Sequence, residues 1–510
     1  MAIDQYLRID KEVVAMLFSS MIFLWVFLPI VIIGNFILSI VKFKNKETGI
    51  KAKNIFLLIS SLIFYAWGEL NYLFIMLASI LINYVGGRVI GVAEKYRKCK
   101  LTLIIILNLG ILFVFKYFNM VVIIIESILS FEGNFIELLQ NMLSMSGTGE
   151  LGLPYIVLPI GISFFTFQAM SYVVDVYRKE TDVQKNFFSF ALYVSFFPQL
   201  VAGPIVKYSD IAEQLQKRKE TIALFVSGQK RFCYGMAKKV LLANTFGEVA
   251  DNIWSLDTAG LGPALAWLGI LAYTLQIYYD FSGYSDMAIG IGRMLGFEFK
   301  ENFNYPYTSL SVQEFWRRWH ISLSTWFREY VYIPLGGNRK GMAKTCMNVF
   351  IVFLLTGVWH GANFTFLIWG IMYALLLILE RLFLGKLLAR NPIKVFNWIY
   401  CMMAVIVGWV FFRADNVFQA IAYLQQMFPL AATQSYYSVF SYLSMKVIVA
   451  FLAGILFAGF LQRPLSALYE KTKDTIPVKT ADLCVQIVTL ILCIFMMVSG
   501  TYNPFIYFQF

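Results

Sequence analysis

Histidine is the residue that this chain has least of: only two occur among its 510 residues, at positions 320 and 360. Charged residues are also scarce, at 14% of the chain, whereas 59% of the residues are apolar. These proportions are typical of an integral membrane protein and exclude an ordinary soluble domain. Because ionisable groups are costly inside a membrane, His320 and His360 are the first candidates for chemistry near neutral pH.

Other missing patterns exclude further classes of protein. The six cysteines show no paired spacing, which argues against disulfides and against a metal site. There is no Walker loop, and Gly290-Ile291-Gly292 lacks the strand and helix of a dinucleotide fingerprint. Internal repeats of the kind found in secondary transporters are not evident. We therefore expect no metal and no permanently bound cofactor.

Long apolar runs are abundant, and each is close to the ~20 residues that cross a bilayer core. They cover residues 16–41, 72–90, 101–125, 153–176, 187–206, 261–281, 362–384, 396–412, 447–461 and 481–499. Shorter runs at 55–67 and 349–358 are typical of half-spans or re-entrant segments. We expect eleven to thirteen membrane segments in a single all-α domain, residues 1–510, with the first run retained as a helix rather than cleaved.

Positive charge is concentrated in a few short loops. Five lysines lie within residues 42–53, four basic residues within 95–100, eight within 207–239, four within 381–394 and four within 463–479. Between Lys116 and Arg178 there is no Lys or Arg, but there are five acids. The positive-inside rule therefore predicts that the basic loops are cytoplasmic, and that residues 126–152 and both termini are outside. The net charge of +12 reflects this topology and attraction to anionic membrane lipid, not nucleic-acid binding.

Three polar clusters interrupt the apolar runs. In the first, Pro198-Gln199-Leu200-Val201-Ala202-Gly203-Pro204, two prolines and a glycine break the helix, which is tolerated only against protein or a cavity. The second, Tyr278-Tyr279-Asp280-Phe281-Ser282-Gly283-Tyr284-Ser285-Asp286, places two carboxylates in an apolar region. Gln199, Asp280, Ser282 and Asp286 either support a site or join helices through hydrogen bonds, and for the second cluster we favour the joining role.

The third cluster runs from Asn302 to Lys344 and alternates arginines with aromatic residues. It contains Asn304, Trp316, Arg317, Arg318, Trp319, His320 and Arg328. Such a segment suits the membrane surface and can bind a phosphate-bearing ligand. An interfacial belt without a ligand would show the same composition.

Together these residues carry a resemblance. The segments 197–205, 280–286 and 316–324, with Gly357-Val358-Trp359-His360-Gly361, resemble signature blocks of the membrane-bound O-acyltransferase (MBOAT) family. The similarity is greatest to the bacterial AlgI, PatA and DltB branch, which exports acyl groups to cell-surface polymers. Segments 18–24 and 502–505 also look AlgI-like, so the resemblance covers nearly the full chain in order. The length of the chain favours the acetylating members over those that transfer D-alanine.

The resemblance implies a ring of tilted and re-entrant helices around a thinned central funnel, in the bacterial cytoplasmic membrane. His360, after Trp359, would be the catalytic base, kept neutral by burial, and His320 would be the second histidine of the branch. His320 or Asn304 would orient the acyl carbonyl. Acetyl-CoA would be the donor, with Trp316, Trp319, Arg317, Arg318 and Arg328 around it, the arginines contacting its phosphates. An extracytoplasmic partner with an SGNH/GDSL-like fold would pass the acetyl group to a polysaccharide or peptidoglycan.

The segment at residues 505–510 has the form Phe-x-Tyr-x-x-Phe-carboxylate. It resembles a motif that D-alanylation systems carry on a separate small subunit, and the predicted topology places this tail, residues 501–510, outside. A phenol and a thiol have pKa values of about 10 and 8.5, so an ester on Tyr507 would keep much of the transfer potential of a thioester. Tyr507 is therefore a candidate acyl relay. The alternative is an aromatic anchor at the end of a membrane helix.

Two rival functions remain open. A transporter or channel would use Asp280, Asp286 and the histidines as a proton path. A protein-modifying acyltransferase would need a pocket of lipid length. The sequence does not name the acceptor polymer or fix the length of the acyl group.

Overall fold

The computed structural model describes residues 16–92, 94–129, 156–429, 435–500, 502–504 and 506. Every regular element among these residues is a helix, which confirms the all-α prediction. In the first part of the chain the elements are η1 (Phe23–Phe27), α2 (Leu28–Ile40), α3 (Lys46–Val92), α4 (Arg97–Lys116), α5 (Phe118–Leu129), α7 (Ile162–Arg178), α8 (Phe187–Ser195), α9 (Phe197–Leu200), α10 (Tyr208–Ile211), α11 (Gln214–Lys217), α12 (Ile222–Ala237), η2 (Lys238–Ala243) and α13 (Asn244–Trp254).

The central and C-terminal parts contain the longest helices and several short ones between them. These elements are η3 (Thr258–Gly260), α14 (Gly262–Met294), η4 (Pro306–Thr308), α15 (Val312–Arg318), α16 (Ile321–Phe327), η5 (Arg328–Tyr332), α17 (Met342–His360), α18 (Phe364–Leu379), η6 (Glu380–Leu384), α19 (Gly385–Arg390), α20 (Lys394–Arg413), α21 (Val417–Met427), η7 (Val439–Tyr442), α22 (Met445–Ile455), η8 (Leu456–Phe460), α23 (Gln462–Thr472) and α24 (Ile476–Ser499).

Seven helices in the described part of the chain are long and apolar enough to cross a membrane, or eight if the bent pair around residue 461 counts as one span. The protein is therefore a multi-pass membrane protein. This count covers only long apolar helices, whereas the eleven to thirteen segments expected from the sequence include tilted and re-entrant ones. The runs at 55–67 and 72–90 lie on the two sides of a kink at Glu69, which divides α3 into two helical parts. The run at 349–358 is not a half-span but part of the 19-residue α17.

The predicted break at Pro198–Pro204 is present. The run at 187–206 divides into α8 and the four-residue α9, and residues 201–207 that follow are not helical. This irregular backbone is satisfied by protein, since the N–H of Ile205 donates to Oγ of Ser322 at 3.0 Å. That contact joins the broken segment to the turn that carries the histidine at position 320.

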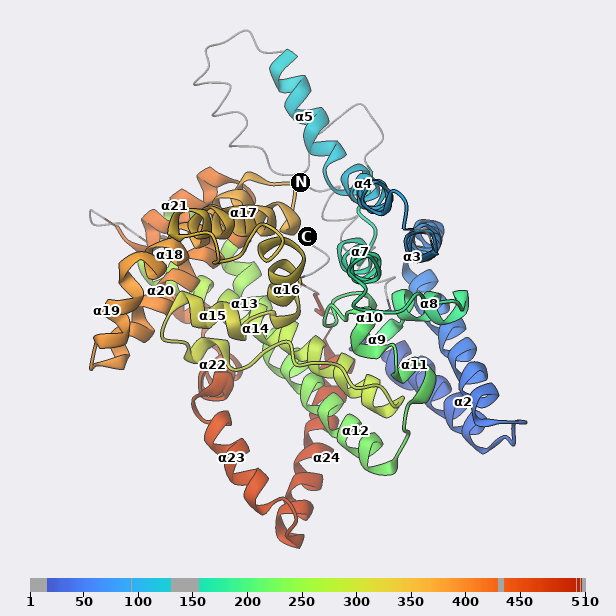
Figure 1. Ribbon diagram of the computed structural model, residues 1–510. Helices are drawn as coiled ribbons and strands as arrows, with labels where there is room; N and C mark the ends of the chain where they lie inside the picture. Colours follow the sequence, from blue (N-terminus) through green and yellow to red (C-terminus); the bar gives the residue numbers. More distant parts are fainter. Residues whose placement is uncertain are drawn as a thin grey trace.

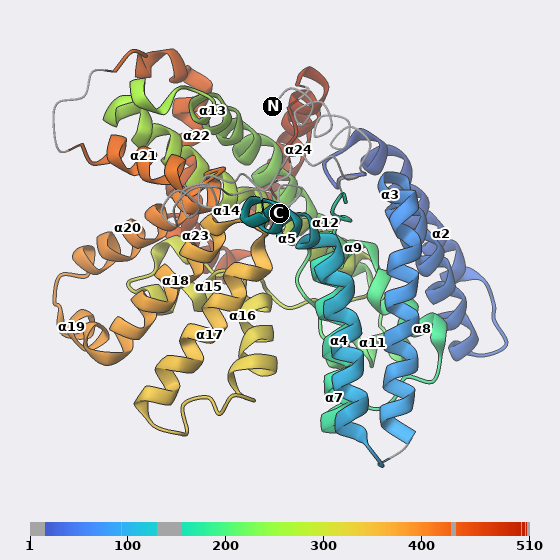
Figure 2. The same cartoon turned by 90° about the horizontal axis from the view of Figure 1, so that it is seen from above.

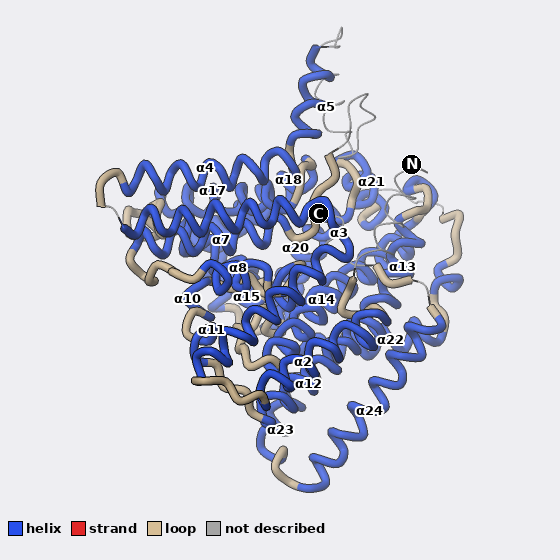
Figure 3. The backbone as a smooth tube through the Cα atoms, turned by 90° about the vertical axis from the view of Figure 1, so that its right-hand side faces the viewer, coloured by secondary structure: helices blue, strands red, loops and turns tan. Residues whose placement is uncertain are grey.

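The helices form two groups with a central connection (Figure 1). The group α2, α3, α4, α7 and α8 lies on one side, and α15 to α21 lie on the other, as the view from above shows (Figure 2). The green helices α12 and α14 run between the groups. From the side, α23 and α24 form a hairpin that projects beyond the rest (Figure 3).

Glycines allow the central helices to touch. A Cβ at Gly235 of α12 would lie 2.7 Å from the carbonyl oxygen of Gly283 in α14. Small residues at such crossings let two backbones approach closely inside a membrane. The polar motif at 280–286 lies entirely within α14, the longest of the central helices.

We expect cysteines introduced at Lys46 and Glu132 to be labelled from opposite membrane faces by an impermeant thiol reagent. Lys46 begins α3 within the lysine-rich segment, and Glu132, outside the described residues, belongs to the stretch without Lys or Arg. The exposed Cys99 and Cys484 must first be replaced with serine. Labelling of both positions from one face would show that the charge argument is wrong.

Candidate active site

His360 is the last residue of α17, where the chain leaves the helix and becomes extended. Its ring is buried, and Trp369 and Phe412 meet it edge-on, with ring centroids 5.0 Å and 4.9 Å away. Gly357 lets α17 approach α18 closely, since a Cβ there would lie 2.5 Å from the carbonyl oxygen of Phe366. Helix packing and aromatic contacts therefore fix the imidazole in one place.

His360 lines two small cavities, and its Nδ1 has no hydrogen-bond partner among the residues described. The first cavity has two further polar side chains, and its lining includes Lys116, Gly161, Ser163, Phe164 and Trp359. The second is mainly aromatic and is lined by Ile277, Trp319, Trp369, Trp409, Phe412 and Ile506. The one imidazole thus faces both a polar and an aromatic space.

His320 lies near this site but in neither lining. It is buried in a left-handed turn between α15 and α16. Its Nδ1 is 3.2 Å from Oδ1 of Asn302, which can only accept, so the hydrogen belongs on Nδ1 and Nε2 keeps its lone pair. Trp359 packs against both histidines, with ring centroids 6.3 Å from His320 and 5.0 Å from His360.

The segment after α24 folds back into the protein instead of extending away from it. The hydroxyl of Tyr502 donates to Oδ2 of Asp251 at 2.6 Å. Ile506 is only 2% exposed and lines the aromatic cavity beside His360. Residues 505 and 507–510, including the predicted relay Tyr507, lie outside the described residues.

Two buried charges hold the backbone of this segment. Lys239 donates from Nζ to the carbonyl oxygen of Pro504, and the N–H of Ile506 donates to Oδ2 of Asp280 at 2.9 Å. The two side chains also pair with each other, Nζ to Oδ1, at 2.6 Å. Asp280 thus contacts the C-terminal segment. Its ion-pair partner, Lys239, was not among the site residues predicted from the sequence.

The other polar residues of the predicted clusters take structural positions. Asp286 pairs with Arg231 and Lys238 at 2.7 Å each, which joins α14 to α12 and η2. Gln199 donates from Nε2 to the carbonyl oxygen of Tyr193 at 2.5 Å. Ser282 is buried, with no hydrogen-bond partner for its hydroxyl among the residues described. Both aspartates of the α14 motif are paired with cations, an arrangement that does not resemble a proton path.

The aromatic residues of the third cluster separate into two places. Trp319 lines the cavity of His360, whereas Trp316 is buried behind it against Trp369 and Tyr373. Asn304 is exposed, and its carbonyl oxygen accepts from Arg318 at 3.2 Å. The buried asparagine beside His320 is Asn302, which sequence reasoning did not single out.

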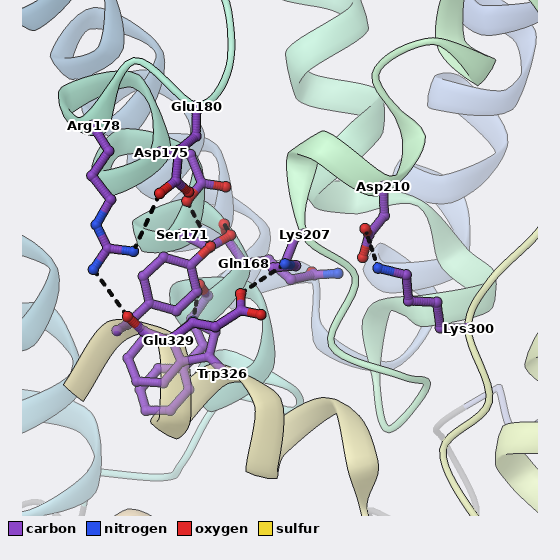
Figure 4. Close-up of polar contacts among 12 residues, drawn as sticks. Gln168, Ser171, Asp175, Arg178, Glu180, Lys207, Asp210, Lys300, Trp326 and Glu329 are labelled. Atoms are coloured by element: carbon purple, nitrogen blue, oxygen red, sulfur yellow. Dashed lines mark hydrogen bonds and ion pairs between the residues drawn. The ribbon is translucent and has the colours of Figure 1, made fainter. Parts of the chain in front are cut away.

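Arg318 pairs with Glu314 at 2.6 Å, while Arg317 and Arg328 are exposed. Next to Arg328, Glu329 is turned toward α7 and pairs with Lys207 at 2.7 Å (Figure 4). Arg178 of α7 donates to the backbone carbonyl of Glu329 at 2.9 Å. This network fixes η5 on α7 and leaves the side chains of two arginines at the surface.

Lys116 is the site residue that sequence reasoning missed most clearly. In the sequence it only marks the start of the stretch without Lys or Arg, but the structure places it in the polar cavity with His360. The described residues contain no group of three His, Cys, Asp or Glu side chains that could hold a metal ion.

Comparisons with known proteins agree on one family. Residues 113–424 match the sequence model of the membrane-bound O-acyltransferase family. The chain is 40% identical to the probable alginate O-acetylase AlgI of Pseudomonas putida, over 97% of this chain and 100% of that protein. It is 42% identical to the AlgI protein of Pseudomonas aeruginosa, over 82% of this chain and 76% of the relative. It is 35% identical to the peptidoglycan O-acetyltransferase of Helicobacter pylori, over 82% and 81%.

Proposed function

The chain belongs to the membrane-bound O-acyltransferase family and is an acyltransferase, and we propose that it moves an acetyl group from cytoplasmic acetyl-CoA across a bacterial cytoplasmic membrane. The acceptor is a cell-surface or extracellular polysaccharide, reached through an extracytoplasmic SGNH-like partner. Relatives named for O-acetylation of alginate and of peptidoglycan support a glycan acceptor. The observation that carries the proposal is that His360 lines both a polar cavity and the aromatic cavity that includes Ile506.

In this proposal His360 is the general base. It removes the proton from the acceptor hydroxyl, whose oxygen then attacks the acyl carbonyl, and the protonated imidazole returns the proton to the leaving thiolate. The aromatic rings around His360 exclude water, which protects the thioester from hydrolysis. His320, held by Asn302, is the second histidine and supports the geometry of the first through Trp359.

Tyr507 is the proposed first acceptor of the acetyl group. Support comes from the described residue before it, because Ile506 lies in the same cavity as His360. Tyr507 directly follows Ile506 in the chain, and consecutive Cα atoms are about 3.8 Å apart. The Lys239–Asp280 pair holds the backbone at Pro504 and Ile506, directly before the proposed relay residue in the chain.

Arg317 and Arg328 are the proposed contacts for the phosphates of coenzyme A. Both side chains are exposed, as a soluble donor requires, and guanidinium groups bind phosphate in a bidentate manner. Arg318 remains in the proposed set, although its pairing with Glu314 suits a role in holding the turn before His320.

The proposal is tested with the purified protein in proteoliposomes that contain acetyl-CoA labelled in the acetyl group. We expect release of free coenzyme A and transfer of label to an added SGNH-like partner, and palmitoyl-CoA should be a poor donor. A transporter would leave the thioester intact. An enzyme that attaches lipid-length acyl chains to proteins would prefer palmitoyl-CoA as the donor. Either outcome would contradict the proposal.

A further inference from the structure

Lys116 is a basic residue inside the catalytic region rather than at its edge. It is the last residue of α4, and it shares the lining of the polar cavity with Ser163 and His360. Its ammonium group lies 5.6 Å from the ring centroid of Trp359, the residue before the catalytic histidine. The amino group of Lys116 therefore lies beside the place where acyl transfer is proposed.

The partners of Lys116 are neutral. Nζ donates to the carbonyl oxygen of Trp359 and to Oγ of Ser163, the latter at 3.3 Å. None of the ion pairs found within residues 16–92, 94–129, 156–429 and 435–500 includes Lys116. Cations inside membrane proteins are costly, and those without a fixed counter-charge mark functional positions. The arrangement suits a negative charge that is present only for part of a reaction cycle.

We propose that the ammonium group of Lys116 holds the carbonyl oxygen of the acyl group while that oxygen carries negative charge. This inference rests on the proposed transfer at His360. The acceptor oxygen gives its proton to His360 and bonds to the acyl carbon, and the π pair of the carbonyl moves onto the oxygen facing Lys116. When the C=O bond re-forms, the C–S bond breaks and the thiolate takes the proton from His360. Lys116 keeps its own protons throughout.

A structural role must be distinguished from this one, because Lys116 also caps the end of α17. The last carbonyl groups of a helix need hydrogen-bond donors. The carbonyl of Trp359 accepts from Lys116 and that of Val358 accepts from Tyr117, two adjacent residues at the end of α4. The hydroxyl of Tyr117 donates to the oxygen of Val358 at 2.5 Å. Tyr117 does not line the polar cavity, so it provides a matched control for capping alone.

The experiment compares Lys116→Gln with Tyr117→Phe in the proteoliposome assay. Glutamine keeps a neutral donor for the carbonyl of Trp359 but loses the positive charge. We expect kcat of Lys116→Gln to fall about 10²–10³-fold, as for the loss of one oxyanion donor, with KM for acetyl-CoA nearly unchanged. Tyr117→Phe should keep nearly the wild-type kcat.

Thermal unfolding of each variant is measured first. If Lys116→Gln does not fold, Lys116→Arg replaces it: a longer, planar cation keeps the cap but misplaces the charge, and kcat should still fall at least about tenfold. Near wild-type kcat in the folded variant would overturn the role of Lys116. An equal fall in Tyr117→Phe would also overturn it, since capping would then explain both. Absence of transfer by the wild-type protein would instead contradict the proposed function.

Discussion

Replacing His360 with alanine is expected to reduce acetyl transfer by about 10²–10⁴-fold, the contribution of a general base. The variant should still fold and enter the membrane, because the space left by the ring is bordered by Trp369, Phe412 and Trp359, which pack against one another or other helices. Release of coenzyme A and transfer of label to the partner measure the effect in proteoliposomes.

His320→Ala is the matched control, since it removes the only other imidazole of the chain. His320 lies in neither cavity lining, so its loss should lower the rate by a smaller factor. Near wild-type transfer by His360→Ala would contradict the assignment of the base. If His320→Ala lowered the rate of transfer more than His360→Ala, His320 would be the base and His360 the supporting residue.

Tyr507→Phe is expected to lower transfer to the partner to background while binding of acetyl-CoA persists. The substitution removes one oxygen and keeps the aromatic ring, so an anchor would lose little whereas a relay would lose the atom that is acylated. Mass spectrometry of the wild-type protein incubated with acetyl-CoA should find an acetyl ester on the peptide that contains Tyr507.

Tyr502→Phe provides a control in the same segment. It also removes a tyrosine hydroxyl, one that binds Asp251 and lies outside both cavity linings. We expect this variant to lose some affinity of the tail for its site but to keep measurable transfer. An active Tyr507→Phe enzyme would exclude the relay, and His360 would remain the proposed base. Equal losses in both variants would indicate that tail docking, not acylation, is the common cause.

The sequence predicted the parts of the site that depend on composition and local pattern. The scarcity of histidine singled out His320 and His360, and the apolar runs predicted an all-helical membrane protein. The prolines at 198 and 204 predicted the break after α9, because proline cannot donate a helical hydrogen bond. Hydropathy also separated the runs at 55–67 and 72–90, which lie on the two sides of the kink at Glu69 in α3.

Contacts between distant segments could not be predicted in the same way. Asn302 and Asn304 look equivalent in the sequence, yet the first is buried against His320 and the second is exposed, because the turn before α15 orients them differently. Lys239 was counted only as a cytoplasmic charge, but it pairs with Asp280 and holds the carbonyl of Pro504. One sequence gives no sign of such pairings when the partners lie on different helices.

By itself, then, the sequence determined that this protein lies in a membrane and which side chains can act as a general base. Hydropathy requires helices in a bilayer, and two imidazoles limit the choice of base. Only the tertiary structure decided which charges enter the site. Lys116 ends a membrane helix like any flanking lysine, but its side chain reaches the carbonyl of Trp359 at the end of α17 and lines the same cavity as His360. The physical reason is that burial and charge pairing depend on distances between helices, which hydropathy along the chain does not contain.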